Sequence, residues 1–324
     1  MKTVLVTGGA GFIGSHLCER LLASGHKVIN IDNFNDFYDP AVKKANIINA
    51  LKDPQYVLFQ GDIRDERILE HVFACYGVDI VVHLAALAGV RRSLSNPLEY
   101  IDIDIKGTVN LLEFCRNYGV EKFVFASSSS VYGSNPVPFS EDQNTCSQVS
   151  PYAASKAAGE LFCKTYNTLF GIPVVCLRFF TVYGPRQRPE MAIHNFTRLI
   201  HEGLEIPVYD NGTSYRDYTY IDDILNGILA AMELKCSFEI FNLGNSSPVK
   251  LNTLIELIEE QLSKPAKRKN LPLQKGDVEY TCADISKAYR LLGYKPEVPI
   301  EEGIFRFVQW YSKNKYKTEA LNVN

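Results

Sequence analysis

The chain has 324 residues, of which 46% are hydrophobic and 22% are charged, so it can bury a large core in one or two domains. Its net charge of −3 shows no basic excess, which excludes the electrostatic footprint of a nucleic-acid-binding protein. No apolar run approaches the length that spans a membrane, and the first residues lead directly into a predicted strand. We therefore expect no signal peptide and a cytoplasmic protein.

A strand, a glycine-rich turn and a helix open the chain. The apolar residues 4–6 fit a short buried strand, and apolar residues at helical spacing follow until Gly25 ends the helix. Between them, Gly9-x-Gly11-x-x-Gly14 fits the dinucleotide-binding fingerprint. Its glycines allow a tight turn, a close approach to a pyrophosphate and close packing of helix on strand. The helix N-terminus then offers free N–H groups to the phosphates.

The predicted second strand, residues 27–32, ends in Asp32. An acid that binds the adenosine ribose hydroxyls is expected here, roughly 20 residues beyond the glycine turn. A carboxylate at this position repels a 2′-phosphate, which favours NAD over NADP as the cofactor. The alternative is an ordinary loop aspartate that caps the next turn. The order of strand, glycines, helix and acid favours the dinucleotide site.

A polar, aromatic loop at 33–40, a basic helix at 42–51 and a third strand at 56–60 are predicted next. Asp62 follows this strand, at the carboxyl end where ligands bind in doubly wound sheets. It either contacts the adenine amine or caps the helix that begins near Glu66, and the sequence favours neither.

The predicted fourth strand, residues 80–86, ends in small residues that leave room for a flat ligand. We interpret His83, inside this strand, as a packed residue and not as a catalyst. A long helix is predicted over 97–118, with Gly119 as its stop.

Four consecutive serines at 127–130 follow the predicted fifth strand, residues 122–126. They either fill a turn or line a site at the carboxyl end of the strand. A helix to about residue 170 and a sixth strand at 173–180 come next. Five alternating strand–helix units specify an α/β fold with a parallel, doubly wound sheet of the Rossmann type.

The strict alternation ends near residue 184, where prolines, arginines and short elements suggest a smaller second domain. Residues 218–232 and 238–243 fit a helix and a strand that return to the first sheet. We therefore predict a Rossmann domain of residues 1–180 plus about 218–245. The smaller C-terminal domain comprises about 181–217 plus 246–324.

Tyr152 and Lys156 lie four residues apart on a predicted helix, so they share a face. A tyrosine with an ordinary pKa near 10 is a poor base at neutral pH. A nearby ammonium group and the positive nicotinamide of bound NAD both favour the phenolate, which could then take a proton from an alcohol as hydride leaves for NAD. Taken alone, this spacing is common for a Tyr–Lys pair on the surface of a helix. Because the pair follows a dinucleotide-binding motif in this chain, the catalytic interpretation is favoured.

Cysteines and histidines give no sign of a metal site. The eight cysteines are scattered without a C-x-x-C pair, and several lie in helical patterns, so reduced packing residues are expected. The six histidines form no H-E-x-x-H or similar cluster, and we predict no metal.

Together these features resemble an extended short-chain dehydrogenase/reductase of the nucleotide-sugar epimerase group, over essentially the whole chain. The motifs that carry this resemblance are the Gly8-x-x-Gly11-x-x-Gly14 turn, Ser-Val131-Tyr132-Gly133, Tyr152-x-x-x-Lys156, residues 177–185, residues 216–223, Gly276-Asp277-Val278, residues 283–288 and residues 292–294.

Within this group the chain is most similar to UDP-glucuronate 4-epimerases, through residues 31–39, 88–91, 126–133 and 188–192. The resemblance implies an isomerase that converts UDP-glucuronate to UDP-galacturonate through a 4-keto intermediate, with NAD as a prosthetic group. It also implies that the C-terminal domain binds the UDP-sugar. A homodimer through a four-helix interface is expected, formed by the helices near 98–118 and 153–170.

Carried over residue by residue, the resemblance implies three sets of site residues. The catalytic set is Tyr152, Lys156 and, three residues before Val131, Ser128, with Ser129 as an alternative. The NAD-binding set is Gly8, Gly11, Phe12, Ile13, Gly14, Asp32, Asn33, Asp62, Ile63, Leu84, Ala85, Ala86, Tyr152 and Lys156. The substrate-binding set is Arg91, Ser127, Ser128, Ser129, Thr181, Arg188, Asn195, Val208, Tyr209 and Arg216.

One position departs from the pattern. Asp104 replaces the usual asparagine before Gly107 and Thr108, so the nicotinamide-side contact of that asparagine does not carry over directly.

Four alternatives remain open. The first two are UDP-glucose or UDP-N-acetylglucosamine 4-epimerases. A nucleotide-sugar dehydratase or decarboxylase is a third, although the related dehydratases carry an Asp-Glu pair, and the decarboxylases a glutamate, where this chain has Ser129 and Ser130. The fourth is a regulator that senses NAD without chemistry, which needs neither Tyr152 nor Lys156.

Overall fold

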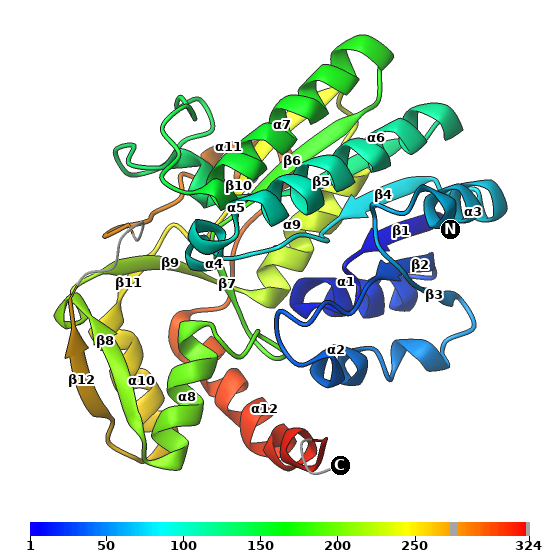
Figure 1. Cartoon of the computed structure of the whole chain (residues 1–324). Helices are drawn as coiled ribbons and strands as arrows, with labels where there is room; N and C mark the ends of the chain where they lie inside the picture. Colours follow the sequence, from blue (N-terminus) through cyan, green and yellow to red (C-terminus); the bar gives the residue numbers. More distant parts are fainter. Residues whose placement is uncertain (273–277, 322–324) are drawn as a thin grey trace.

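A seven-stranded parallel sheet forms the centre of the computed structural model, which describes residues 1–272 and 278–321 (Figure 1). The strand order is β10-β6-β5-β4-β1-β2-β3, so the order reverses between β1 and β4. The predicted doubly wound sheet is confirmed, including the return of β10 to it. The strands are β1 Thr3–Thr7, β2 Lys27–Asp32, β3 Tyr56–Gln60, β4 Ile80–His83, β5 Lys122–Ser128, β6 Val174–Phe179 and β10 Phe238–Leu243.

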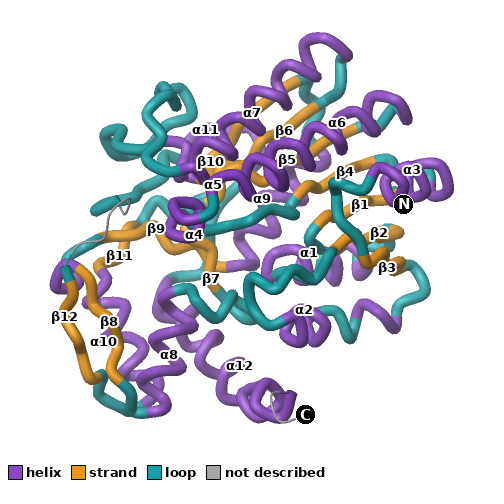
Figure 2. Tube along the Cα trace, viewed as in Figure 1, coloured by secondary structure: helices purple, strands orange, loops and turns teal. Residues whose placement is uncertain are grey.

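Helices cover both faces of this sheet (Figures 1 and 2). One face packs against α3 Glu66–Tyr76, α6 Gly107–Tyr118 and α7 Pro151–Phe170, and the other packs against α1 Phe12–Ala23 and α9 Ile221–Glu233. Side chains alternate along each strand, so Leu5 faces the first layer while Val4 and Val6 face the second. Both faces are buried, which explains the nearly continuous apolar strands.

Local capping residues set where α7 starts and stops. The hydroxyl of Ser150 accepts the N–H of Ala153 at 3.1 Å, which satisfies one of the N–H groups left free at a helix start. Gly171, in the left-handed conformation, ends the helix. As a result, Tyr152 and Lys156 lie in the first turns of α7, beside the carboxyl end of β5.

The C-terminal region forms two small sheets, β11-β9-β7 and β12-β8, with helices packed beside them (Figure 2). Its apolar residues from α8, α10 and α12 join the core under α1 and α9, so the two regions share one core. No helix in the described part of the chain has the length and apolar character needed to span a bilayer. The elements are β7 Thr181–Tyr183, α8 Ala192–Glu202, β8 Glu205–Tyr209, β9 Tyr215–Tyr220, β11 Pro248–Lys250, α10 Leu251–Leu262, β12 Lys267–Leu271, α11 Ser286–Leu292 and α12 Ile300–Leu321.

Four predicted boundaries are wrong. The helix predicted at 42–51 is α2 Pro40–Asn46 followed by a separate 3-10 turn, Ala50–Lys52. Strand β4 ends at His83 and not at residue 86. Residues 218–220 belong to strand β9 and precede α9, because this aromatic and threonine-rich stretch pairs with β7.

The fourth wrong boundary is the long helix predicted at 97–118. It consists of α5 Pro97–Tyr100, a π-helical turn Ile101–Lys106 and α6, preceded by the short α4 Val90–Ser95. A π-turn inside a helix is rare and often lies at a functional site. Gly276 and Asp277, named in the sequence motif, lie outside the described residues.

Candidate active site

A cavity of about 400 Å³ opens at the carboxyl ends of β1, β2, β4 and β5, where the strand order reverses. Ligands bind at this place in doubly wound sheets. The cavity brings most of the predicted site residues together. Its lining includes Gly8, Gly11, Phe12, Ile13, Gly14, Asp32, Asn33, Asp62, Ile63, Leu84, Ala85, Ala86, Ser127, Ser128, Ser129, Tyr152, Lys156, Thr181 and Arg188.

The glycine turn provides a cradle without side chains. Gly8 has φ +73°, and a Cβ there would lie 2.9 Å from the backbone of Ala85. A Cβ on Gly14 would overlap the carbonyl oxygen of Gly8. Gly9 instead donates its N–H to Asn30 and does not line the cavity, so the turn is built on Gly8, Gly11 and Gly14. No side chain caps the first turn of α1, and its N–H groups remain available to a pyrophosphate.

Asp32 lies buried at the end of β2 and orders the turn around it. One carboxylate oxygen accepts the N–H of Ala10 at 2.9 Å, and the other accepts the N–H of Phe34 at 2.8 Å. Each oxygen keeps a lone pair for a ribose hydroxyl. These contacts hold the carboxylate at the cavity wall as the predicted ribose ligand.

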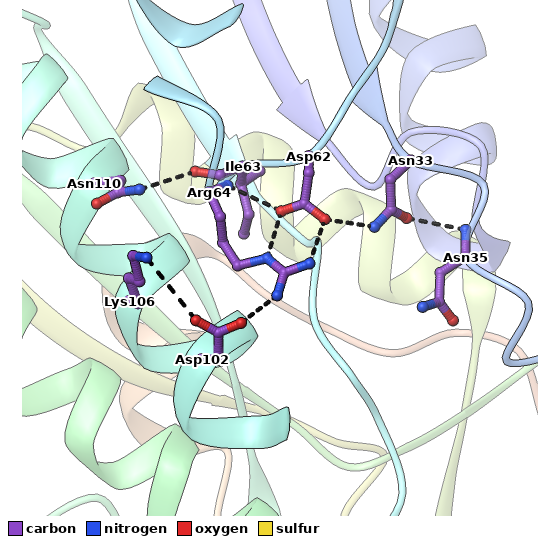
Figure 3. A network of polar contacts seen from close by, with 8 residues as sticks. All are labelled: Asn33, Asn35, Asp62, Ile63, Arg64, Asp102, Lys106 and Asn110. Carbon is purple, nitrogen blue, oxygen red and sulfur yellow. Dashed lines mark hydrogen bonds and ion pairs between the residues drawn. The ribbon is translucent and has the colours of Figure 1, made fainter. Parts of the chain in front are cut away.

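Asp62 is at the centre of a polar network beside the cavity (Figure 3). Its oxygens accept from the side chain of Arg64 at 2.8 and 2.9 Å and from Asn33 at 2.9 Å. The Arg64 hydrogen bond is the main reason that the pKa of Asp62 falls to about 2. Asp65, and not Asp62, caps α3, so the capping alternative for Asp62 is wrong. The prediction that Asp62 contacts adenine stays open.

The catalytic candidates converge at the end of β5. The ammonium of Lys156, which is 5% exposed, donates to the carbonyl of Ala126 at 2.9 Å. Ser128 accepts the N–H of Ser130 at 3.1 Å and shares a hydroxyl hydrogen bond with it at 2.9 Å. Tyr152 lines the same cavity, and its ring packs edge-on against Tyr100. A phenol, an ammonium group and a serine hydroxyl therefore line one space.

Ser127 lines the cavity but its hydroxyl is committed elsewhere. It donates to Glu160, which is also paired with the buried Arg178 at 2.7 Å. This buried network fixes the end of β5 beneath the catalytic candidates. If Ser127 contacts the substrate as predicted, its backbone is therefore the group that remains available for that contact.

His83 belongs to the core, in agreement with the prediction from sequence. Its ring nitrogens contact the hydroxyls of Thr7 at 2.8 Å and Thr108 at 3.0 Å. Burial, with a smaller effect of the Lys156 ammonium, lowers the pKa of His83 to about 3, so the ring is neutral at physiological pH.

An aromatic side chain lies between two arginines at the edge of the cavity. The ring of Phe37 is 4.8 Å from the guanidinium of Arg92 and 5.4 Å from that of Arg188. Arg188 also pairs with Glu190 at 2.9 Å. The aromatic residues of the 33–40 loop were the available signal for this contact, but the sequence did not indicate where the loop would pack.

Five predicted substrate residues do not line the cavity. Val208 is buried in the core, which leaves only its backbone for a ligand. The guanidinium of Arg91 lies 5.0 Å from the ring of Tyr209, so an arginine of α4 reaches β8 of the C-terminal region. Asn195 accepts from Arg198, and Arg216 donates to the carbonyl of Tyr215 at 2.9 Å.

Several cavity residues were missed by the sequence analysis. Some come from loops, and others from α2, α4, the π-helical turn, β6 and β7, which are distant from one another in sequence. They include Asn35, Phe37, Tyr38, Lys43, Leu87, Ala88, Gly89, Val90, Ile103, Ser130, Phe179, Phe180, Val182 and Met191.

The sequence matches the model of the NAD dependent epimerase/dehydratase family over residues 4–244. The chain belongs to this family. It is 45% identical to the UDP-glucuronate 4-epimerase of Thermodesulfobacterium geofontis over 324 residues, which cover both chains completely.

Two solved structures are similar over almost the whole chain. The Bacillus cereus UDP-glucuronic acid 4-epimerase, in complex with UDP-glucuronic acid and NAD, matches with a TM-score of 0.91 and 37% identity, covering 96% of this chain and 99% of that one. The Thermotoga maritima UDP-glucose 4-epimerase, with UDP-glucose, matches with a TM-score of 0.88 and 32% identity, covering 97% and 99%. The protein is therefore an NAD-dependent nucleotide-sugar epimerase.

The cofactor bound by the protein can be tested directly. We expect purified protein to release NAD or NADH on denaturation and little NADP, because the buried carboxylate of Asp32 repels a 2′-phosphate. Chromatography of the released nucleotide measures this. Asp32→Asn, which keeps the shape and removes the charge, should raise the relative affinity for NADP, whereas mostly NADP on the unchanged protein contradicts the role of Asp32.

Proposed function

We propose that the protein is a UDP-glucuronate 4-epimerase. The observation that carries the proposal is the composition of the cavity beside Tyr152. The hydroxyl-bearing residues Ser128, Ser129 and Thr181 and the cation Arg188 line it together. Hydroxyl donors and a nearby guanidinium suit the carboxylate of a hexuronic acid. The 45% identity to a protein with this name supports the same assignment.

In the proposed reaction, Tyr152 takes the proton of the C4 hydroxyl and Ser128 hydrogen-bonds the same oxygen. Lys156 supports the phenolate by its charge. NAD, when bound at the glycine cradle, supplies the hydride acceptor and donor at C4. The 4-keto sugar rotates while its diphosphate stays held, and Tyr152 returns the proton once the opposite face is presented.

The C-terminal region is proposed to hold the nucleotide during that rotation. In this division, residues 1–180 and 218–245 bind NAD, and residues 181–217 and 246–324 bind the UDP-sugar. We assign the diphosphate to Arg216 and Asn195, and the uracil to Tyr209 and the backbone of Val208. The contact between Arg91 and the ring of Tyr209 supports a site that spans the two regions.

A second candidate is UDP-glucose 4-epimerase. The Arg188–Glu190 ion pair, at 2.9 Å, partly neutralises the cation beside the cavity. Neutral hydroxyls then remain for the hydroxymethyl group of a hexose. The similarity to the Thermotoga maritima UDP-glucose 4-epimerase favours the same alternative.

A panel of UDP-sugars separates these candidates. UDP-glucuronate, UDP-glucose and UDP-N-acetylglucosamine are each incubated with the protein, and the products are identified by chromatography and NMR. We expect UDP-galacturonate to form fastest. Arg188→Gln should lower the rate of UDP-glucuronate epimerisation more than the rate of UDP-glucose epimerisation. The proposal fails if UDP-glucose is the faster substrate and Arg188→Gln affects both equally.

We also propose a homodimer through the outer faces of α5, the π-helical turn, α6 and α7. Large apolar side chains on these faces are exposed, among them Leu98 at 76%, Leu161 at 70% and Leu169 at 66%. A second copy of the chain would remove this apolar surface from water.

The dimer proposal predicts a change of mass in solution. Leu161→Arg should give a monomer by light scattering, because an unpaired charge at a buried interface is costly. Tyr289→Arg, at a tyrosine of α11 that is 62% exposed and outside the proposed interface, is the matched control and should leave the mass unchanged. A monomeric wild-type protein contradicts the proposal.

A further inference from the structure

Asp104 is a buried carboxyl group that the proposed reaction does not use. It lies in the π-helical turn Ile101–Lys106, with 2% of its surface exposed. Ile103, the residue before it, lines the cavity. The carboxyl therefore lies directly behind the cavity wall.

Its two oxygens join two different parts of the site. Oδ1 accepts the backbone N–H of Leu87 at 2.8 Å, and Leu87 belongs to the cavity wall that follows β4. Oδ2 accepts the hydroxyl of Ser155 at 3.0 Å. Ser155 stands between Tyr152 and Lys156 on α7, and its hydroxyl also contacts the carbonyl of Tyr152 at 2.9 Å. The carboxyl group of Asp104 thus connects the cavity wall at Leu87 to the turn of α7 that carries Tyr152 and Lys156.

The backbone of Asp104 is held as well. Its carbonyl accepts the hydroxyl of Thr108, which in turn contacts the buried His83 at 3.0 Å. His83 is neutral, because burial and the Lys156 ammonium lower its pKa to about 3. The charged groups that act on Asp104 are Lys156, whose ammonium favours the ionised carboxyl, and Glu99, whose carboxylate has a smaller opposite effect.

Opposing influences act on the charge of Asp104. Burial is the largest influence and raises the pKa of Asp104 overall, whereas the ammonium of Lys156, the Leu87 N–H and the Ser155 hydroxyl oppose this rise and favour the ionised form. A backbone hydrogen bond from Leu87, a hydroxyl proton that Ser155 shares with the carbonyl of Tyr152, and the ammonium of Lys156 are the groups that favour a charged carboxylate here.

We propose that ionised Asp104 is a positioning residue of the hydride-transfer site. It holds the cavity wall at Leu87 against the turn of residues 152–156. Its negative charge also favours the oxidised form of bound NAD. The oxidised nicotinamide carries a positive charge that the reduced ring lacks. A carboxylate one layer behind the cavity therefore stabilises the oxidised ring more than the reduced ring. This keeps the protein in the state from which a turnover starts. The inference rests on NAD dependence and not on which sugar is the substrate.

The test is the redox balance of the bound cofactor. Holoenzyme is equilibrated anaerobically with dithionite and an indicator dye, and bound NADH is read from its near-ultraviolet absorbance. At a fixed dye potential, Asp104→Asn should raise the ratio of bound NADH to NAD by at least about tenfold, the effect of a unit charge about 12 Å away at an effective dielectric constant of about 20. Asp104→Asn keeps the shape and an acceptor for Leu87.

Matched variants separate charge from structure. Asp102→Asn makes the same substitution two residues earlier on the π-turn, where the side chain is 47% exposed and paired with Arg64 (Figure 3). It should change the ratio by less than about twofold, because solvent screens exposed charges. Ser155→Ala removes one of the hydrogen bonds that favour the ionised carboxyl and keeps the carboxyl itself, so its ratio should lie between those of wild type and Asp104→Asn. Asp104→Glu keeps the negative charge, so its ratio of bound NADH to NAD should lie nearer the wild-type value than that of Asp104→Asn.

Two results overturn the inference. One is an Asp104→Asn ratio within about twofold of wild type. The other is equal shifts for Asp104→Asn and Asp102→Asn. Asp104→Ser provides a second neutral variant if Asp104→Asn does not fold, as judged by thermal melting. The measurement needs no sugar, so an error in the proposed substrate would appear in the UDP-sugar panel and not here.

Discussion

Replacing Tyr152 by phenylalanine should lower turnover by at least about a hundredfold while the protein keeps its bound NAD. The lost hydroxyl is the proposed proton acceptor, and general acid–base catalysis contributes about this much or more. The glycine turn and Asp32 are distant parts of the cavity and stay intact, so cofactor binding should persist. Steady-state turnover and the NAD content of denatured protein measure the two effects.

Tyr100→Phe is the matched control for this experiment. The ring of Tyr100 packs against Tyr152 at 6.2 Å between centroids, and its hydroxyl donates to the carbonyl of Gly89 at 3.0 Å. Removing it costs one hydrogen bond, about 1 kcal/mol, without removing the proton acceptor. Its turnover should stay within about tenfold of wild type. Near-wild-type turnover of Tyr152→Phe would exclude Tyr152 from the proposed mechanism.

The parts of the site that could be predicted from sequence depend on short-range patterns. The glycine turn, Asp32 and the pair Tyr152 and Lys156 lie on elements whose periodicity is local. The parallel sheet places the ends of β1, β2, β4 and β5 at one edge, whatever the loops between them do. These residues therefore meet in one cavity because of topology alone.

The parts that could not be predicted depend on contacts between distant segments. The π-turn is stabilised around Asp104 by Leu87 and Ser155, which are 17 and 51 residues away, and no helical periodicity encodes such contacts. In the same way, Phe37 meets arginines from α4 and from the segment before α8. The sequence pattern of a continuous helix at 97–118 hides this break, because the apolar spacing continues across it.

The products formed from UDP-glucuronate depend on the residues at positions 129 and 130, where this chain has serines and no acids. The 4-keto intermediate formed from UDP-glucuronate has two possible reactions. It can lose its carboxylate as carbon dioxide, or its ketone can be reduced back to an alcohol. The first route protonates C5 as carbon dioxide leaves, and dehydration of a hexose also needs acid–base groups at C5 and C6. By the sequence resemblance, Ser129 and Ser130 correspond to the positions where dehydratases and decarboxylases carry acids. A hydroxyl without an adjacent base is a poor proton shuttle.

Two buried carboxyls, Glu160 and Asp104, lie on elements that line the cavity, and hydrogen bonds already occupy both. Glu160 accepts from Ser127 and holds Arg178 through two hydrogen bonds, at 2.9 and 2.7 Å. Asp104 accepts from Leu87 and Ser155 behind the cavity wall. Neither is free to serve C5, so the ketone should simply be reduced again.

We therefore expect UDP-galacturonate as the product from UDP-glucuronate, with carbon dioxide below about one-hundredth of it, the size of effect that a missing acid–base group produces. Gas analysis measures carbon dioxide, and a reaction in deuterium oxide adds a second readout. Decarboxylation places solvent deuterium at C5 of the pentose, whereas epimerisation leaves C5 untouched. Carbon dioxide in amounts equal to the UDP-glucuronate consumed would show that a proton donor reaches C5. That donor must then come from a group other than Ser129 and Ser130, because among the described residues neither hydroxyl is hydrogen-bonded to a base that could restore its proton.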